Sequence, residues 1–234
     1  MTGLPDVPGN EVVNRYLFIG AGDLAREITV IAENEAFANG SSAEFYYYTE
    51  DEKDTEKVQS PIVPDRVIFR GIEPLLEQCS PQEWKAVCCI GKPRVRERFY
   101  YEFCKMGFAF TSIIAGNATV ETTCMGPGTV VFPGARLALG CRIGCNAVIN
   151  YGAIVGHDAV IGDHSVISPG VSLGGRIEGG KAVLFGIGSS ILENRSIGDY
   201  AVLAAGSSAW MNVPADSTVV GVPATRKKIP GRKG

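Results

Sequence analysis

Aliphatic side chains recur at every sixth position through much of the second half of the chain. The first run of these positions is Val131, Leu137, Ile143, Ile149, Val155, Ile161, Ile167 and Leu173. The positions two before them are mostly small, from Ala135 to Val171. A strict period of six fits neither the 3.6-residue repeat of a helix nor the alternation of a half-buried strand. It is typical of a stacked solenoid, in which each strand and turn buries its aliphatic residue against neighbouring repeats.

The six-residue register is interrupted once. It lapses near Gly174–Gly180 and resumes in a second run at Phe185, Ile191, Ile197 and Leu203. The positions four after these residues are again mostly small, with Arg195 as the exception among Ser189, Arg195, Ala201 and Ser207. Glycine suits tight turns because it lacks a Cβ atom. The interruption therefore predicts a loop between two coils, although a functional role for Gly174 and Gly175 is an equal alternative.

The first half of the chain alternates between strand and helix patterns. We expect strands at residues 15–20, 45–49, 67–70, 84–90 and 108–114, and helices at 23–36, 73–79 and 93–106. Asp23 can serve as the N-cap of the first helix, and Gly107 can end the last one. Such alternation predicts a small parallel sheet covered by helices.

Composition narrows the classes of function. The chain has 234 residues, of which 45% are hydrophobic, and a net charge of −3, which argues against a dedicated nucleic-acid binder. No apolar stretch reaches the roughly 18 residues that cross a bilayer, and the start lacks a signal-peptide pattern, so we expect a cytoplasmic protein without a membrane partner. The seven cysteines are expected to be free thiols, with Cys88 and Cys89 in a buried strand. With only two histidines and no CxxC motif, we expect no metal.

Several hexads carry a resemblance to a known family. Ile143–Val148 (IGCNAV), Val155–Val160 (VGHDAV) and Ile197–Val202 (IGDYAV) resemble the hexapeptide repeat of left-handed β-helix acyltransferases. Gly221–Ala224 (GVPA) is similar to a tail common in that superfamily. With Gly20-Ala21-Gly22 opening the first half, the chain resembles sugar acetyltransferases that modify nucleotide-linked amino sugars or sialic acid. The match extends from about Arg15 to Arg226.

This resemblance implies an architecture and a set of ligands. It implies a Rossmann-like α/β domain over residues 1–112, which binds the nucleotide-sugar, and a left-handed parallel β-helix over residues 113–234. It also implies a homotrimer that uses acetyl-CoA as co-substrate and needs no metal. Aliphatic and small residues on exposed coil faces would be buried between the subunits.

His157 is the main catalytic candidate, with Asp158 as its partner. A neutral imidazole titrates near pH 6.5 and can accept a proton from an attacking amine. A neighbouring carboxylate can orient the ring and stabilise the imidazolium. The alternative is a polar pair at a solvated corner, and the resemblance favours catalysis because the family's base matches His157.

Two further polar positions are less specific. The resemblance places Asn150 near the sugar, although an Asn that supports a corner backbone is nearly as good an interpretation. His164 resembles a second active-site histidine, but the family's second histidine aligns with Val166. We therefore expect His164 to be a surface residue, and the role of the second histidine is open.

The resemblance also places coenzyme A along the later coils. A backbone N–H near Gly175 would stabilise the oxyanion that forms on the thioester. Besides Gly175, we expect coenzyme A to contact Ser168, Ile187, Ala205 and Arg226. Arg226 begins a basic tail that can attract the phosphates, although a solvated tail is the plainer interpretation.

The motif G-x-G-x-x-A at Gly20–Ala25 follows a predicted strand and precedes a predicted helix. By itself it would suggest a dinucleotide. The resemblance instead implies that Gly20, Ala21 and Gly22, with Glu50 after the second strand, contact a nucleotide-sugar. Glu50 and Asp51 begin an acidic run that also fits a solvated loop. Asp23 beside a diphosphate would repel it unless the carboxylate caps the helix.

These observations predict transfer of an acetyl group from acetyl-CoA to the amino group, at C4, of a nucleotide-linked amino-deoxy sugar in bacterial surface glycan biosynthesis. The alternatives are O-acetylation of sialic acid or another sugar, a nicotinamide-dependent oxidoreductase, and a non-catalytic scaffold. A zinc hydratase on the same solenoid needs three histidines in each site, which this chain cannot supply.

Overall fold

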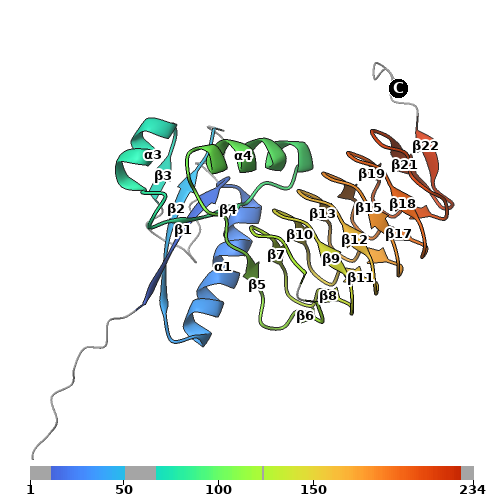
Figure 1. Cartoon of the computed structure of the whole chain (residues 1–234), viewed down its shortest axis with the longest axis horizontal. Helices are drawn as coiled ribbons and strands as arrows, with labels where there is room; N and C mark the ends of the chain where they lie inside the picture. Colours follow the sequence, from blue (N-terminus) through green and yellow to red (C-terminus); the bar gives the residue numbers. More distant parts are fainter. Residues whose placement is uncertain (1–11, 51–66, 123, 228–234) are drawn as a thin grey trace, which may run out of the picture.

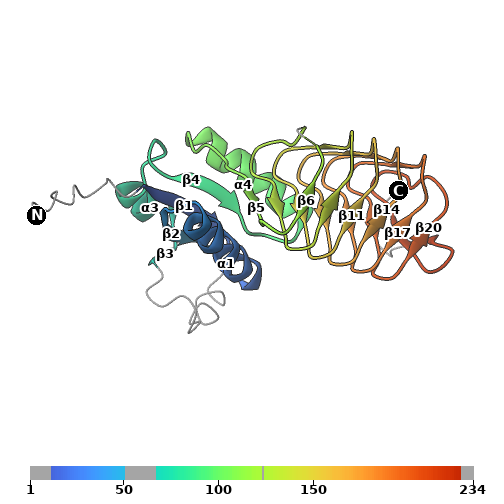
Figure 2. The ribbon, with the colours of Figure 1, turned by 90° about the horizontal axis from the view of Figure 1, so that it is seen from below.

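The computed structural model describes residues 12–50, 67–122 and 124–227. An α/β layer at the N-terminal end leads into a long prism of stacked coils (Figure 1). The view from below shows the coils following one another along the prism axis (Figure 2). Among the described residues, no helix is long and apolar enough to cross a membrane.

The α/β layer contains four parallel strands in the order β3-β2-β1-β4. These are β1 (Val13–Ile19), β2 (Ser42–Tyr48), β3 (Val67–Phe69) and β4 (Lys85–Cys88). The helices that follow strands are α1 (Asp23–Ala38), α3 (Ile72–Gln78) and α4 (Pro93–Lys105). The predicted parallel sheet with helical connections is confirmed. The seven cysteines are free, as expected, and burial raises the pKa of Cys88.

Two expectations about this layer are wrong. Residues 108–114 do not form a fifth strand of the sheet: only Phe110 bridges to Ala86, and β5 (Ile113–Ile114) pairs with a strand of the prism. Asp23 is not an N-cap, because Gly22 holds that position without a side-chain cap and Asp23 is the first helical residue. Asp23 pairs instead with Arg26 at 3.4 Å.

The prism has three parallel sheets, which we call its first, second and third faces. The first face comprises β5, β7 (Val130–Val131), β10 (Val148–Ile149), β13 (Val166–Ile167), β16 (Leu184–Phe185), β19 (Val202–Leu203), β21 (Thr218–Val220) and the antiparallel β22 (Thr225–Lys227). The second face comprises β6 (Thr119–Val120), β8 (Arg136–Leu137), β11 (Ile154–Val155), β14 (Ser172–Leu173), β17 (Ser190–Ile191) and β20 (Ser208–Ala209). The third face comprises β9 (Arg142–Ile143), β12 (Val160–Ile161), β15 (Glu178–Gly179) and β18 (Ser196–Ile197).

The six-residue register continues without a break, so the expected loop near Gly174–Gly180 is wrong. β15 pairs in register with β12 on one side and β18 on the other. Gly179 holds the aliphatic position, where an added Cβ would lie 3.2 Å from the Val160 carbonyl oxygen. Ile177, two residues earlier, is fully buried where other coils carry a small residue. The large and small positions are therefore exchanged in this one hexad, and the core stays filled.

Each corner of the prism is turned by one residue in the left-handed backbone region. These positive-φ residues recur every six positions, at Asn146, Gly152, Asp158, His164, Gly170, Arg176, Ala182, Gly188, Asn194, Tyr200 and Gly206. The chain bends there, one residue before the small residue of the hexad. Glycine, Asn and Asp tolerate this region better than other residues do.

The two parts of the chain share a hydrophobic core. Phe18 and Val87 of the sheet cluster with Val130, Phe132 and Val148 of the first face. The opposite side of the sheet is covered by α3 and α4, which bury Leu75, Phe99 and Phe103. The prism is therefore attached directly to the sheet, and a pocket in one part has a defined position relative to the other.

Candidate active site

Three corners separate the faces, and the predicted residues divide among them. The first corner, after the first face, includes residues 150–152, 168–170, 186–188 and 204–206. The second corner, after the second face, includes 156–158, 174–176 and 192–194. The third corner, after the third face, includes 162–164, 180–182 and 198–200. Residues 18 apart stack on successive coils, as hydrogen bonds between such pairs show.

The structure brings His157 and Asp158 together on the second corner. His157 Nδ1 lies 2.9 Å from Asp158 Oδ2, and both side chains are more than half exposed. Because a carboxylate only accepts hydrogen bonds, Nδ1 carries the proton and Nε2 of the neutral ring keeps its lone pair. This arrangement can remove a proton from an incoming nucleophile.

The backbone of this pair is fixed by the coils on both sides. The Asp158 N–H donates to the Leu139 carbonyl on the preceding coil at 3.0 Å. The His157 carbonyl accepts from the Arg176 N–H on the following coil at 2.8 Å. The imidazole is therefore carried by a rigid scaffold, as catalytic geometry requires.

Two glycines leave room for the pair. A Cβ at Gly175 would lie 2.5 Å from His157 Nε2, so the ring packs directly against the backbone of the next coil. A Cβ at Gly140, on the preceding coil, would lie within contact distance of Asp158 Oδ1. Sequence reasoning found Gly175 but missed Gly140, although its spacing of 18 residues from Asp158 was available.

Gly174 and Gly175 differ in role. A Cβ at Gly174 would lie 2.5 Å from the Glu193 N atom, so glycine there is required by the stacking of the next coil. The Gly175 N–H has no hydrogen-bond acceptor among the described residues, like the equivalent N–H groups of Ile187 and Glu193, whereas those of Cys145 and Lys181 donate to aspartates. Gly175 therefore retains a donor beside the His157 ring.

The other predicted prism residues do not join His157 within one chain. Asn150, Ser168, Ile187 and Ala205 lie on the first corner, at the other edge of the second face. The Asn150 Oδ1 accepts the Tyr151 N–H at 2.7 Å and supports its own corner. Arg226 is exposed on β22, at the far end of the prism.

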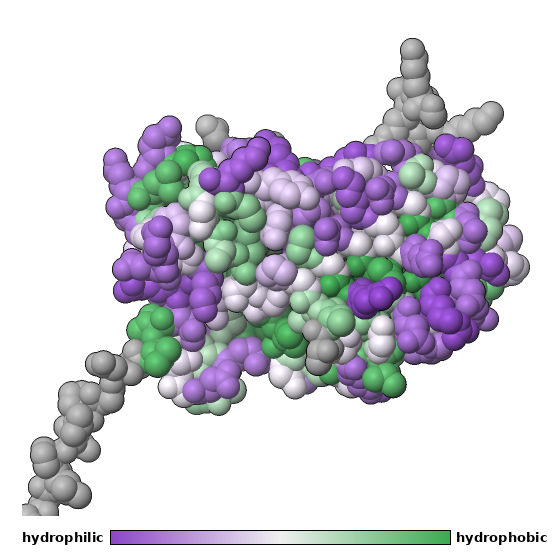
Figure 3. Space-filling model, in the orientation of Figure 1, coloured by the Kyte–Doolittle hydropathy of each residue, from purple (hydrophilic) through white to green (hydrophobic). Residues whose placement is uncertain are grey.

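Large apolar side chains are exposed on the second face and its corners. Ile187 is 62% exposed, Leu139 71% and Ile154 44%. Apolar surface is also visible among polar residues over the prism (Figure 3).

A pocket of about 410 Å³ opens where β1, β2 and β4 end. Gly20, Gly22 and Glu50, which the resemblance assigned to the nucleotide-sugar, are among the residues that line this pocket. Ala21 was expected there too, but its side chain is fully buried in the core beneath α1, so that expectation is wrong for the side chain. The acidic Asp51 lies outside the described residues.

The pocket offers donors for an anion. The N-termini of α1 and α4 both border it, and neither helix has a side-chain cap. Uncapped N–H groups and the positive end of a helix favour phosphate groups. Lys92 and Arg98 add positive charge, and Arg98 pairs with Glu50 at 2.8 Å. Sequence reasoning missed both cations because their position depends on how α4 docks.

His164 is buried, so the expectation of a surface residue is wrong. Its side chain lies on the third corner against the rings of Tyr100 and Tyr101 from α4. Asn146 Nδ2 donates to His164 Nδ1 at 3.1 Å. Burial lowers the pKa of His164, and the neighbouring Asp163 opposes that shift. A neutral His164 packs α4 onto the prism and lies on a different corner from His157.

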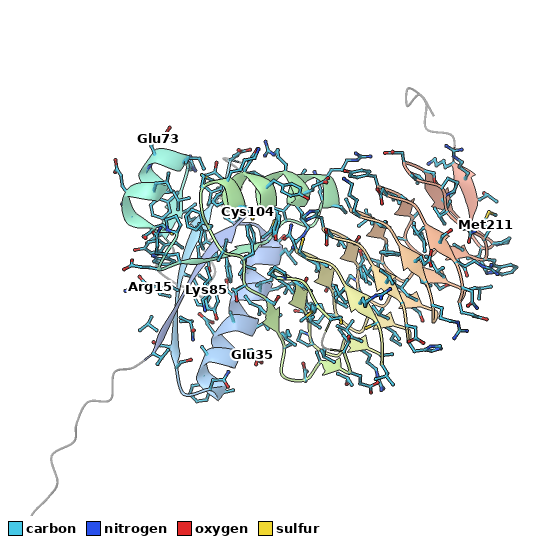
Figure 4. All side chains as sticks on the ribbon, in the orientation of Figure 1. Arg15, Glu35, Glu73, Lys85, Cys104 and Met211 are labelled. Carbon is cyan, nitrogen blue, oxygen red and sulfur yellow. The ribbon has the colours of Figure 1, made fainter. Side chains whose placement is uncertain are left out.

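Only one group in the described residues could approach a metal site. Ligand atoms of Cys145, Asp163 and His164 lie within 4.8 Å of one another. Asp163 Oδ1 already accepts the Cys145 N–H at 2.8 Å, and burial raises the pKa of the Cys145 thiol to about 11. Cys104 of α4 is labelled in Figure 4, and it interacts with Tyr100, which also interacts with Cys145. Because the Cys145 thiol is protonated and the Asp163 carboxylate is hydrogen-bonded, this group fits a packing contact with α4 better than a metal site. Val166, where the family's second histidine would lie, is also buried.

Comparison with known proteins agrees with this architecture. Residues 140–175, which include His157 and Gly175, match the bacterial transferase hexapeptide family of six repeats. The matched repeats and the three-sided prism show a left-handed parallel β-helix built from hexapeptide repeats. The match begins at Gly140 and ends at Gly175, the two glycines that border the His157–Asp158 pair.

Solved structures align with more than nine-tenths of the chain. The acetyltransferase domain of PglB from Neisseria gonorrhoeae FA1090, in complex with acetyl coenzyme A, is 25% identical, with a TM-score of 0.78 over 92% of this chain and 100% of that one. A mutant of perosamine N-acetyltransferase from Caulobacter crescentus, in complex with CoA and GDP-perosamine, is 22% identical, with a TM-score of 0.78 over 94% of this chain and 100% of that one. WeeI from Acinetobacter baumannii AYE is 22% identical, with a TM-score of 0.79 over 92% of this chain and 100% of that one.

Proposed function

We propose that this chain is an acetyl-CoA-dependent N-acetyltransferase that acts on a nucleotide-linked amino sugar. The observation that carries the proposal is the half-exposed His157–Asp158 pair on a hexapeptide-repeat corner, with the imidazole packed against the backbone of Gly175. Further support comes from the pocket at the ends of β1, β2 and β4, which has helix N-termini and cations at its edge, and from similar structures that contain acetyl coenzyme A, or CoA with GDP-perosamine.

In the proposed reaction the sugar amine attacks the thioester carbonyl. His157 Nε2 takes a proton from the amine as the new C–N bond forms, and Asp158 stabilises the imidazolium. The Gly175 N–H donates to the oxyanion of the tetrahedral intermediate. The carbonyl re-forms as the C–S bond breaks, and the proton held by His157 passes to the leaving thiolate. An amide and free coenzyme A result.

The nucleotide part would occupy the pocket at the ends of β1, β2 and β4. The uncapped N-termini of α1 and α4 and the Lys92 ammonium would bind the diphosphate. Glu50, which pairs with Arg98 at 2.8 Å, would accept hydrogen bonds from sugar or base donors. Arg26 partly neutralises Asp23 through their 3.4 Å contact, which lessens repulsion of a diphosphate.

The proposed active unit is a homotrimer. His157 and Gly175 lie at one edge of the second face, whereas Asn150, Ser168, Ile187 and Ala205 lie at its other edge. Both groups can serve one acyl transfer if the first corner of one subunit meets the second corner of the next. The product would be a C4-acetamido sugar nucleotide for surface glycan synthesis, made in the cytoplasm.

A thiol-release assay tests the proposal. Wild-type protein and acetyl-CoA are mixed with UDP-, GDP- and dTDP-linked 4-amino-6-deoxy sugars and, separately, with sialic acid. We expect release with one amino-sugar nucleotide and a loss of about 10²- to 10⁴-fold in His157→Asn, the contribution typical of a general base. If coenzyme A thiol is released only with sialic acid as acceptor, the reaction is O-acetylation and the proposed N-acetylation is wrong. Full activity in a folded His157→Asn protein would exclude the proposed base.

A further inference from the structure

Arg96 on α4 is the largest fully buried side chain in the part of the chain that the structure describes. Burying a guanidinium is costly unless each part of it is paired. Nη1 donates to the Cys88 carbonyl at 2.7 Å and to the Ile90 carbonyl at 2.9 Å. Nε donates to the Asn146 carbonyl at 3.0 Å, and Nη2 donates to Asn146 Oδ1 at 2.9 Å. Four hydrogen bonds therefore hold this one group.

The acceptors belong to the two halves of the molecule. Cys88 ends β4, and Ile90 lines the pocket beside it. Asn146 is a left-handed corner residue of the prism, with φ of 51°. Its amide also donates to the Arg96 carbonyl at 3.3 Å and to His164 Nδ1 at 3.1 Å. A single planar side chain thus connects the pocket wall to the coil that precedes the one carrying His164.

We propose that Arg96 is a positioning residue that holds the nucleotide-sugar pocket at the separation from His157 that acetyl transfer requires. The inference rests on the proposed function. Arg96 itself touches neither the pocket nor His157, and it acts through the Ile90 carbonyl and Asn146.

Attachment of the two halves does not depend on this group alone. The shared apolar core already joins the sheet to the first face. A second polar contact joins α4 to the third corner, where partly buried Glu97 accepts hydrogen bonds from Lys181 at 3.3 Å and from the Tyr200 hydroxyl at 3.0 Å. A buried charged group adds little net stability over apolar packing, but its fixed fork of donors sets geometry. A displacement near 1 Å between reacting groups can cost about 100-fold in rate.

Asn146→Gly tests the proposal because it alters only the prism end of the contact. Glycine keeps the positive φ and the backbone carbonyl, and it removes the amide that meets Arg96 and His164. Asn194→Gly is the matched control, since Asn194 has φ of 57° and pairs with exposed Arg176 at 2.8 Å, away from α4. Arg96→Lys is the second variant, since Lys keeps the charge but cannot reproduce the fork.

Turnover and binding are measured separately. We expect kcat with the nucleotide-linked amino sugar to fall at least 10-fold in Asn146→Gly and in Arg96→Lys, and to stay within twofold of wild type in Asn194→Gly. Calorimetric affinities of Asn146→Gly for UDP, GDP or dTDP alone, and for coenzyme A alone, should stay within twofold of wild type.

The outcomes separate this inference from the proposed function. Unchanged kcat in Asn146→Gly would overturn the positioning role of Arg96. Lower nucleotide affinity and a lower melting temperature with unchanged kcat would also overturn it, because a purely structural role gives that result. If Asn146→Gly does not fold, unchanged kcat in Arg96→Lys overturns the inference in the same way. Wild-type protein that turns over no nucleotide-linked amino sugar would instead reject the proposed function.

Discussion

At the scale of single residues, the His157 ring depends on the absence of a side chain one coil away. Gly175→Ala would place a methyl 2.5 Å from Nε2 and push the ring out of its position. Gly175 does not have a positive φ, so the backbone accepts alanine without strain. We expect kcat for acetyl transfer to fall about 100-fold with little change in melting temperature.

Gly179→Ala is the control for this substitution, because it adds the same methyl on the same coil but on the third face. The nearest atom to that Cβ would be the Val160 carbonyl oxygen at 3.2 Å, far from the imidazole. Equal losses of activity in the two variants would show that the effect of Gly175→Ala comes from coil packing and not from the ring.

The buried His164 makes the stability of the fold depend on pH. Burial lowers the pKa of His164 from the ordinary 6.5. The negative charges of Asp163 and Glu97 raise this pKa, and the positive charges of Arg96 and Lys181 lower it further. Below pH 6.5 the unfolded chain therefore binds a proton that the folded chain binds only at lower pH, so stability falls as pH decreases. Thermal melts between about pH 7.5 and 5 should show a steeper decline for wild type than for His164→Gln. Parallel declines would show that other groups carry the acid sensitivity.

At the scale of elements, one hexad carries its large core residue at the position where most other hexads carry a small one. Ile177 is completely buried and compensates for Gly179, whose position is aliphatic in most of the other hexads. Ile177→Ala would leave both positions small, and we expect a loss of about 2 to 5 kcal/mol in unfolding free energy. Chemical denaturation measures it, with Ile191→Val as a mild control of about 1 kcal/mol. A smaller loss in Ile177→Ala than in Ile191→Val would contradict the exchange of large and small positions.

The elements also show what sequence could predict. Period and burial follow from local pattern, so the coils, the parallel sheet and the His157–Asp158 pair were predictable. Burial of His164 and the charges of Lys92 and Arg98 at the pocket depend on where α4 docks, which no local pattern encodes. The pattern of aliphatic residues did not predict that the prism continues through Gly179, because the large residue of that hexad, Ile177, lies two positions before the expected one.

At the scale of the whole molecule, the residues predicted to take part in acyl transfer, apart from Arg226, lie on two corners at opposite edges of the second face. Within one chain, Asn150 and His157 cannot meet, because strand β11 lies between them and holds them at opposite edges of the second face. If two subunits form each site, the residue from the first corner and the base from the second corner come from different chains. The two can then be inactivated separately and combined.

Subunit mixing tests this arrangement. His157→Asn and Asn150→Ala proteins should each have low activity alone, the second through loss of the proposed sugar contact. After equal amounts are unfolded and refolded together, a site with both native residues forms wherever an Asn150→Ala chain supplies His157 and its neighbour supplies Asn150. Random assembly of a ring gives about one quarter of the sites in this state, so about a quarter of wild-type turnover should return. Mixing without refolding is the control for recovery that does not depend on reassembly of the chains. No recovery after refolding into oligomers of normal size would mean that both residues act within one chain, or that Asn150 has no part in the site, and the shared-site arrangement would be wrong.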